Sequence, residues 1–312
     1  MDGYSLTYEL AKILRESTTT SLIWDDRTSY DYLYEAACEL TRRTNSLTST
    51  QTITTVASTS EYLLNADYLC LYLRNKEDEN QFYIKYNDGT NDWFINWRDY
   101  SAIIHGNLTS TQAIPDSFTV TDYQTMTAPI TGTATSSGAS SNGECTLTDS
   151  TAPFTNASVG DEVHNTTDGS HGIVISKTST SALVTCMFGG TNNEWTSADA
   201  YLVVPQGRMI LKLNPPPSTS GHTITFYYLQ RPTPVYSPYK NYRFNSSFKP
   251  ALVCYAAWKY KYRDDTPNYG DAWYKYFEME CRKANQTMNR AAVRETWGVT
   301  FKKRSYRDRS YR

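Results

Sequence analysis

The stretch that decides the fold is residues 207–230, which reads GRMILKLNPPPSTSGHTITFYYLQ. Its two apolar runs, 208–213 and 223–230, are short and rich in β-branched and aromatic residues, as strands are. Three consecutive prolines, 215–217, separate them. Proline cannot donate a ladder hydrogen bond, so we expect an extended connection or an edge there. The stretch therefore predicts a β-hairpin of the main sheet with a proline-rich connection.

More strands are expected toward the N-terminus, where the sequence from Thr48 onward is rich in Thr, Val, Ile and Tyr with frequent turn residues. Asn87-Asp88-Gly89 is a hairpin-like turn between two of these runs. Such spacing predicts an antiparallel sheet. The predicted strands are 51–56, 68–74, 82–86, 93–96 and 118–123.

A second β unit is expected inside this sheet. Residues 131–142 are rich in Thr, Gly, Ser and Ala without apolar periodicity, which indicates a junction. Short strand-like runs separated by glycine and asparagine turns follow it, and they predict a small β-barrel or sandwich inserted as residues 131–204. The predicted strands are 159–163, 172–176, 182–187 and 200–204.

Both ends of the chain have the apolar spacing of amphipathic helices. We expect one helix capped by Ser5, one beginning after Ser29, one over 250–263, and one that follows Thr266-Pro267 and reaches Arg290. The apolar residues that carry the first two are Leu6, Leu10, Ile13, Leu14, Leu33, Ala36, Ala37 and Leu40.

These elements predict an α+β fold, in which a helical bundle built from both chain ends carries a projecting antiparallel β region and the inserted module. The expected divisions are helical 1–48, β 49–130, module 131–204, β-hairpin and linker 205–247, helical 248–292 and a basic tail 293–312.

Composition points to surfaces that meet partners. The chain has 26 tyrosines among 312 residues, and tyrosine suits surfaces that are buried against a partner yet partly wet; it also fills β surfaces. The net charge of −2 creates no overall field that attracts nucleic acid or an anionic membrane. Residues 302–312 nevertheless carry six basic side chains against Asp308 alone.

Little in the sequence indicates chemistry. The motifs of phosphate-binding loops, nucleophile elbows and metalloproteases do not occur, and the four histidines include no recognised catalytic setting. His164 and His171, with Asp161 and Glu162, are a conceivable metal site; the alternative is a pair of polar residues at a hairpin. Six scattered cysteines favour reduced thiols. We therefore expect no enzyme activity, no cofactor and no metal.

No targeting segment is expected either. The first ten residues lack a basic start followed by an apolar run, and no stretch approaches the apolar length of a membrane helix. The sequence therefore predicts a protein made in the cytoplasm without a membrane partner.

Several segments together resemble the head-to-tail adaptor, or connector, proteins of short-tailed phages. Residues 207–217, then 224–229 and Arg231-Pro232, resemble the strand, proline turn and strand that precede the family's C-terminal helices. The segments Lys249-Pro250, Ala256-Ala257 and Tyr269 to Arg290 are similar to the family's ending. The module, with Val159-Gly160-Asp161, Asn165 to Gly169 and Gly189 to Asn193, looks like one that recurs in phage structural proteins.

The resemblance implies a virion protein that forms a homo-oligomeric ring, a dodecamer, beneath the portal protein. It further implies a tail nozzle or tail fibre protein as the next partner and packaged DNA in the channel. The inserted module departs from the plainest members of the family. The residues expected to dock on the portal are Phe301, Lys302, Lys303, Arg304, Tyr306, Arg307, Arg309, Tyr311 and Arg312.

Two other functions stay open on the sequence. The chain could be a tail receptor- or glycan-binding protein, in which Trp195 in the module stacks on a sugar. Alternatively, the basic tail could bind DNA through nonspecific phosphate contacts.

Overall fold

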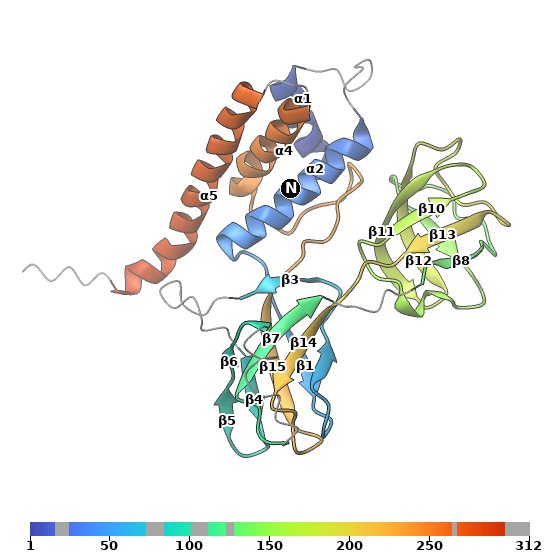
Figure 1. The fold of residues 1–312 in the computed structure, drawn as a ribbon. Helices are drawn as coiled ribbons and strands as arrows, with labels where there is room; N and C mark the ends of the chain where they lie inside the picture. Colours follow the sequence, from blue (N-terminus) through green and yellow to red (C-terminus); the bar gives the residue numbers. More distant parts are fainter. Residues whose placement is uncertain (16–24, 73–83, 101–111, 123–127, 264–266, 297–312) are drawn as a thin grey trace, which may run out of the picture.

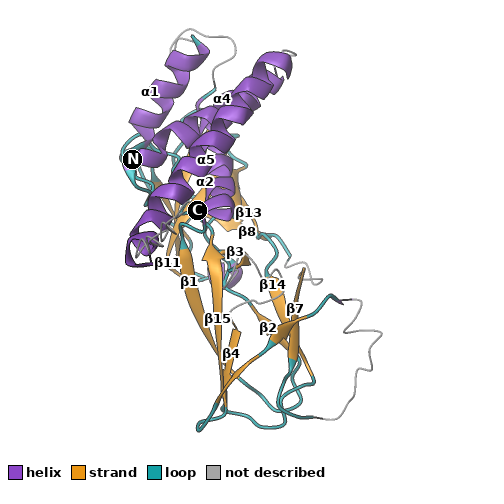
Figure 2. Cartoon of the chain, turned by 90° about the vertical axis from the view of Figure 1, so that its left-hand side faces the viewer, coloured by secondary structure: helices purple, strands orange, loops and turns teal. Residues whose placement is uncertain are grey.

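Three bodies make up the chain (Figure 1): a unit of helices, a β-sandwich below it and a separate β module beside both. The computed structural model describes residues 1–15, 25–72, 84–100, 112–122, 128–263 and 267–296. Figure 2 shows from a second side that helices and sandwich occupy opposite ends.

The helical unit joins segments from both ends of the described chain. Its helices are α1 (Gly3–Leu14), α2 (Asp26–Thr44), α4 (Lys249–Arg263) and α5 (Pro267–Thr296), with the short 3-10 turn η2 (Ser246–Phe248) leading into α4. Helix α4 packs against the other three, because its apolar residues surround it on several sides. The buried residues at the centre include Leu6, Leu10, Leu33, Leu40, Leu252, Tyr260 and Phe277.

Aspartates cap the first two helices. The carboxylate of Asp2 accepts the Ser5 N–H at 2.6 Å, and that of Asp25 accepts the Thr28 N–H at 2.9 Å. Each carboxylate satisfies a backbone donor that has no partner inside the helix. The predicted cap at Ser5 and the predicted start after Ser29 are therefore wrong by about one turn.

The sandwich consists of two sheets that share one core. The first has the order β1 (Thr48–Thr54), β15 (Thr223–Gln230), β4 (Ile84–Asn87) and β5 (Asp92–Phe94), with β3 (Tyr68–Leu71) also paired to β15. The second has the order β2 (Glu61–Leu63), β14 (Met209–Asn214), β7 (Ser117–Asp122) and β6 (Asn96–Trp97). Both sheets contribute to the core, which contains Ile53, Ile84, Phe118, Leu211, Leu213, Ile224 and Phe226. The predicted hairpin around Asn87-Asp88-Gly89 is confirmed, since β4 pairs with β5.

The hairpin predicted from residues 207–230 is wrong. Strand β14 pairs with β2 and β7, whereas β15 pairs with β1, β3 and β4 in the other sheet. The proline-rich connection leads the chain from one sheet to the other. Prolines 215–217 lack the N–H groups that a hairpin ladder needs, which is why the two strands separate.

The module is a six-stranded antiparallel sheet in the order β8 (Ile130–Thr133), β13 (Ala200–Val204), β10 (Glu162–Asn165), β11 (His171–Ser179), β12 (Ala182–Phe188) and β9 (Cys145–Thr148). The 3-10 turn η1 (Phe154–Asn156) packs Phe154 into its core. The sheet curls until its two edges meet, where Ser136 bridges Thr148. Strand β8 lies inside the segment predicted to be a junction, because tertiary pairing with β13 makes a strand of small residues.

The module is inserted into the connection between β7 and β14. These two strands are antiparallel neighbours, and Asp122 at the end of β7 is the ladder partner of Met209 at the start of β14. The chain therefore leaves and re-enters the sandwich at adjacent points.

The predicted fold class is wrong. A helical bundle with a projecting β region and a small module was expected, but β structure dominates the described residues, with three sheets and two separate β cores beside four α-helices. Most strands are short, and several depend on ladder partners that are distant in sequence, as β1 does on β15 and β9 on β12.

Candidate assembly surfaces and a junction cleft

The predicted portal-docking residues lie outside the described part of the chain. This concerns every residue of the set from Phe301 to Arg312, including Lys302, Lys303, Arg304, Tyr306, Arg307, Arg309 and Tyr311. Their docking role therefore stays a prediction.

Trp195 lies in the core of the module rather than on its surface. Its side chain is 1% exposed, and its indole N–H donates to the Thr185 hydroxyl at 2.9 Å. The ring of Tyr201 meets it edge-on. A small β unit has few large side chains with which to fill its centre, and Trp195 fills it. A ring buried in this way has no open face on which a sugar could stack.

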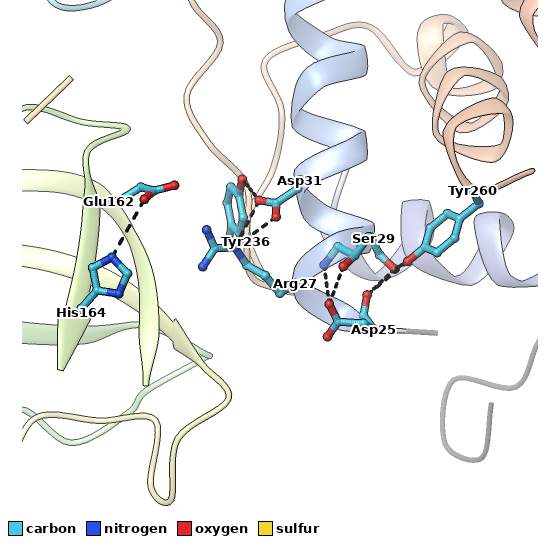
Figure 3. A network of polar contacts seen from close by, with 9 residues as sticks. Asp25, Arg27, Ser29, Asp31, Glu162, His164, Tyr236 and Tyr260 are labelled. Atoms are coloured by element: carbon cyan, nitrogen blue, oxygen red, sulfur yellow. Dashed lines mark hydrogen bonds and ion pairs between the residues drawn. The ribbon is translucent and has the colours of Figure 1, made fainter. Parts of the chain in front are cut away.

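His164 and His171 are neighbours across the β10–β11 ladder. Their rings are stacked with centroids 6.3 Å apart, and Nε2 of His164 lies 4.0 Å from the Glu162 carboxylate. Figure 3 shows that the Glu162 and His164 side chains lie side by side on β10. Asp161 instead accepts the backbone N–H groups of Ser158 and Gln206. No three His, Cys, Asp or Glu side chains of the described residues are placed to hold a metal ion together.

A small aromatic interface holds the module against the helical unit. Tyr30 on α2 and Tyr236, in the segment after β15, bury their rings against Ile173, Ile175 and Cys186 of the module. Tyr34 and Phe188 pack at the margin of this docking interface. Burial raises the pKa of both Tyr30 and Tyr236 well above the usual phenol value.

A polar network borders the docking interface on α2 (Figure 3). Arg27 Nε lies 3.2 Å from both carboxylate oxygens of Asp31, and the Tyr236 hydroxyl donates to the same carboxylate at 2.5 Å. The guanidinium of Arg27 also lies over the rings of Phe188 and Tyr236, at 6.0 and 5.8 Å from their centroids. Arg27 therefore touches both the module and the segment after β15, and it fixes their approach to α2.

A cleft of about 580 Å³ opens where the three bodies meet. This junction cleft is lined by Tyr34 of α2, by the sandwich at Asp67, Arg208 and Gln230, by the segment 231–234, and by the module at residues 157–159 and 175–177. Three of its lining side chains are cations, Lys177, Arg208 and Arg231. All three are half-buried. Among the described residues, neither a histidine nor a cysteine lines it.

The cations of the junction cleft are anchored by neutral groups. Lys177 Nζ donates to the carbonyls of Thr155 and Ala157 at 2.8 and 3.1 Å. Arg208 donates to the Ser158 hydroxyl at 3.2 Å, and Arg231 donates to the Gln206 side-chain oxygen at 2.8 Å. Burial lowers the pKa of Lys177, the positive charge of Arg208 lowers it further, and the nearby carboxylate of Asp161 acts in the opposite direction.

One flank of the helical unit exposes aromatic residues of α1. Tyr4 and Tyr8 are 65% and 57% exposed, and their rings stack with centroids 6.2 Å apart. Helical geometry places them opposite Leu6 and Leu10, which face the core. This α1 patch lies beside the module, because Tyr4 also lines a second cleft that includes Phe188.

The other flank exposes residues of α5. Tyr276 and Met279 are 50% and 41% exposed, and the ring of the half-buried Trp273 packs on Tyr276 with centroids 5.8 Å apart. Phe277 and Cys281 of the same helix face the core. Figure 1 shows α5 on the side of the helical unit opposite the module. The α1 patch and this α5 patch therefore lie on different flanks.

Helices α1, α2 and α5 bury one face in the core, whereas α4 is buried on several sides. None of those in the described ranges combines the length and the apolar character needed to cross a membrane. The comparisons with known proteins identify no family: the chain matches no protein-family model and no curated protein.

Proposed function

We propose that the chain is a structural subunit of a tailed-phage particle, a head-to-tail adaptor that forms a ring between the portal protein and the tail. The observation that carries the proposal is the pair of exposed aromatic patches, Tyr4 with Tyr8 on α1 and Tyr276 with Met279 on α5. They lie on different flanks of one rigid helical unit. Two different patches suit a ring.

A closed ring uses heterologous contacts, in which one surface of each subunit meets a different surface of the next. Tyrosine and methionine side chains are enriched at the centres of such interfaces, and tyrosine in particular offers a large contact area at low entropic cost. A two-fold dimer would need a single self-complementary patch instead. The α1 patch of one copy would therefore meet the α5 patch of its neighbour.

The three-body architecture agrees with this role. The helical unit provides the flanks of the ring, while the sandwich and the module extend away from the helices (Figures 1 and 2). These two β bodies offer separate surfaces for a tail nozzle or tail fibre protein. The resemblance of Lys249-Pro250, Ala256-Ala257 and the segment from Tyr269 to Arg290 to the ending of the adaptor family supports the same proposal.

Cross-linking tests the ring contact directly. The full chain is prepared as Tyr8→Cys, as Tyr276→Cys and as wild type, which controls for the natural thiols. Mixing the two variants with the portal protein and a short bis-maleimide should give an 8-to-276 cross-link and ring-shaped particles in negative-stain images. Cross-linking of each variant only to itself, or particles that remain monomeric with the portal present, would overturn the proposal.

Substitution of the α5 patch provides the matched functional test. Tyr276→Ser combined with Met279→Ser should prevent ring formation without lowering the melting temperature, since both side chains are exposed. Val56→Ser, at a residue of the sandwich that is 53% exposed, is the control and should leave rings intact. Intact rings in the α5 double variant would show that this flank is not the contact.

The alternative of a glycan-binding tail protein relied on an exposed Trp195, but this residue is buried. We therefore retain the adaptor proposal alone.

A further inference from the structure

We propose that the junction cleft is a binding site for a compact phosphate-type oxyanion, held by Lys177, Arg208 and Arg231. The site lies between the module, the sandwich and the segment that follows β15, so it is distinct from the two aromatic patches used for assembly.

Charge is the first argument. In the described residues, no carboxylate lies within ion-pair distance of the charged nitrogens of Lys177, Arg208 or Arg231. Three half-buried cations line one cleft, where the charges of Lys177 and Arg208 repel one another and the carboxylate of Asp161 offsets part of this repulsion. A multivalent anion placed among them would remove this repulsion.

The nearby acids are already engaged. Asp67 lines the cleft, but one of its oxygens accepts the Tyr228 hydroxyl and the other accepts the Gln230 amide, both at 2.8 Å. The two oxygens of Asp161 accept the backbone N–H groups of Gln206 and Ser158 at 2.9 and 2.7 Å. Both carboxylates are thus fixed by neutral donors of the protein, and the cations keep donors for a ligand.

Donor geometry is the second argument. A guanidinium group has five N–H donors, and an ammonium group has three. Arg208 donates to the Ser158 hydroxyl, while Arg231 donates to the Gln206 amide oxygen. These contacts hold each guanidinium in place and leave further N–H groups for a tetrahedral oxyanion, which arginine binds in bidentate fashion.

The cleft also has a suitable size. Its volume of about 580 Å³ lies within the range of small-ligand sites, and Val159, Pro232 and Pro234 form part of its wall. Free phosphate or a phosphate group carried on a larger molecule would fit there. Because Lys177 belongs to the module and Arg208 to the sandwich, a bound anion would fasten these two bodies together.

Titration of the full chain with inorganic phosphate tests the site, with chloride at equal ionic strength as the reference. Calorimetry should show saturable binding, and the melting temperature should rise with phosphate. Arg208→Gln and Lys177→Gln should each weaken binding by about tenfold, since each removes one charge-assisted contact. Arg282→Gln removes an exposed cation of α5 and should leave binding unchanged.

Two further measurements complete the test. Arg231→Lys keeps the charge but loses the planar donor pair, so it should weaken phosphate binding while the protein stays folded. A short DNA duplex identifies the source of the phosphate. If the duplex competes with phosphate for the wild type and this competition is lost in Arg208→Gln, the site binds the nucleic-acid backbone. If the duplex does not compete, the site binds free phosphate. Absence of saturable phosphate binding by the wild type, or equal affinity in Arg208→Gln and Arg282→Gln, would overturn the proposal.

Discussion

The hydroxyl oxygens of Ser29 on α2 and Tyr260 on α4 lie 2.6 Å apart in the buried centre of the helical unit, although 231 residues separate them. Both hydroxyls are also within hydrogen-bond distance of the Asp25 carbonyl, at 2.9 and 3.2 Å (Figure 3). Burial raises the pKa of Tyr260 to about 12. This contact links α2, near the start of the sequence, to α4, near its end.

Tyr260→Phe should therefore lower the free energy of unfolding by about 1 kcal/mol, the net value of one buried hydrogen bond. Urea unfolding measures the change, and Tyr262→Phe, at a residue that is 62% exposed, should have no effect. In a double-mutant cycle with Ser29→Ala, the combined loss should be smaller than the sum of the two single losses. Strict additivity would show that the two hydroxyls are not coupled.

The docking interface should control the freedom of the module. Tyr236→Ala removes a buried ring and the hydrogen bond to Asp31, so the module should detach from α2 while its own core stays folded. Small-angle scattering should report a larger radius of gyration. Tyr239→Ala, at a tyrosine of the same segment that is 69% exposed, is the control. Unchanged scattering in Tyr236→Ala would contradict the assignment.

Removal of the module should leave the rest folded. Strands β7 and β14 are ladder partners at Asp122 and Met209, so a short Gly-Ser turn can replace residues 131–204. The shortened chain should still unfold in one cooperative transition. Its melting temperature should be lower, because Tyr30 and Tyr236 become exposed when the module residues that bury them are removed. Loss of the cooperative transition in this variant would mean that the sandwich depends on the module.

Alkaline pH should destabilise the protein. Burial raises the pKa of Cys145 to about 11 and that of Cys281 to about 12, and it raises the pKa of Tyr30, Tyr236 and Tyr242 as well. A group whose pKa is raised by folding stabilises the fold below its unfolded pKa, and this contribution is lost as the pH rises toward the folded value. The loss should therefore begin near pH 8.5, where unfolded thiols ionise, and steepen above pH 10 as phenols follow.

Urea unfolding between pH 8 and pH 11 measures this dependence. Each group that ionises only in the unfolded chain contributes a slope of about 1.4 kcal/mol per pH unit. Cys145→Ala removes one such group and should flatten the slope relative to wild type. A free energy of unfolding that stays constant from pH 8 to pH 11 would contradict the burial of these thiols and phenols.

The basic tail should attach the chain to the portal. Deletion of residues 301–312 removes six basic side chains and should abolish joining to portal-bearing heads, and the attachment of the full chain should weaken with salt. Co-sedimentation with heads at two salt concentrations is the measurement. Undiminished joining by the truncated chain at moderate salt would place the docking surface elsewhere, while tight binding of the isolated tail to DNA but not to portal would favour a role in the channel.

The sequence predicted local elements well where the pattern was regular. The apolar spacing of α1, α2 and α4 and the hairpin β4–β5 are examples. It failed for β14 and β15, which look like a hairpin along the chain but belong to opposite sheets. Strand pairing is decided by partners such as β7 and β1, which are distant in sequence. The residues around β14 and β15 therefore do not indicate which strands they pair with.

The candidate sites show the same division. The local sequence Asn192-Asn193-Glu194-Trp195 is consistent with an exposed ring in a turn and with a ring in the core, and the structure places Trp195 in the core of the module. Lys177, Arg208 and Arg231 are isolated basic residues along the chain, and no motif connects them. Only the meeting of module and sandwich brings these three cations to one cleft. A search for a sequence motif could therefore not have identified these three residues as one site.

The sequence by itself determined the amphipathic helices near both ends, many of the strands, the turn between β4 and β5, and that an inserted unit follows β7, because propensity and periodicity act over a few residues. The tertiary structure alone decided which strands share a sheet, that Ser29 meets Tyr260, and which cations and aromatic rings gather on one surface. These relationships follow from the burial of apolar faces between distant segments, a global requirement that many sequences of the same local pattern could satisfy differently.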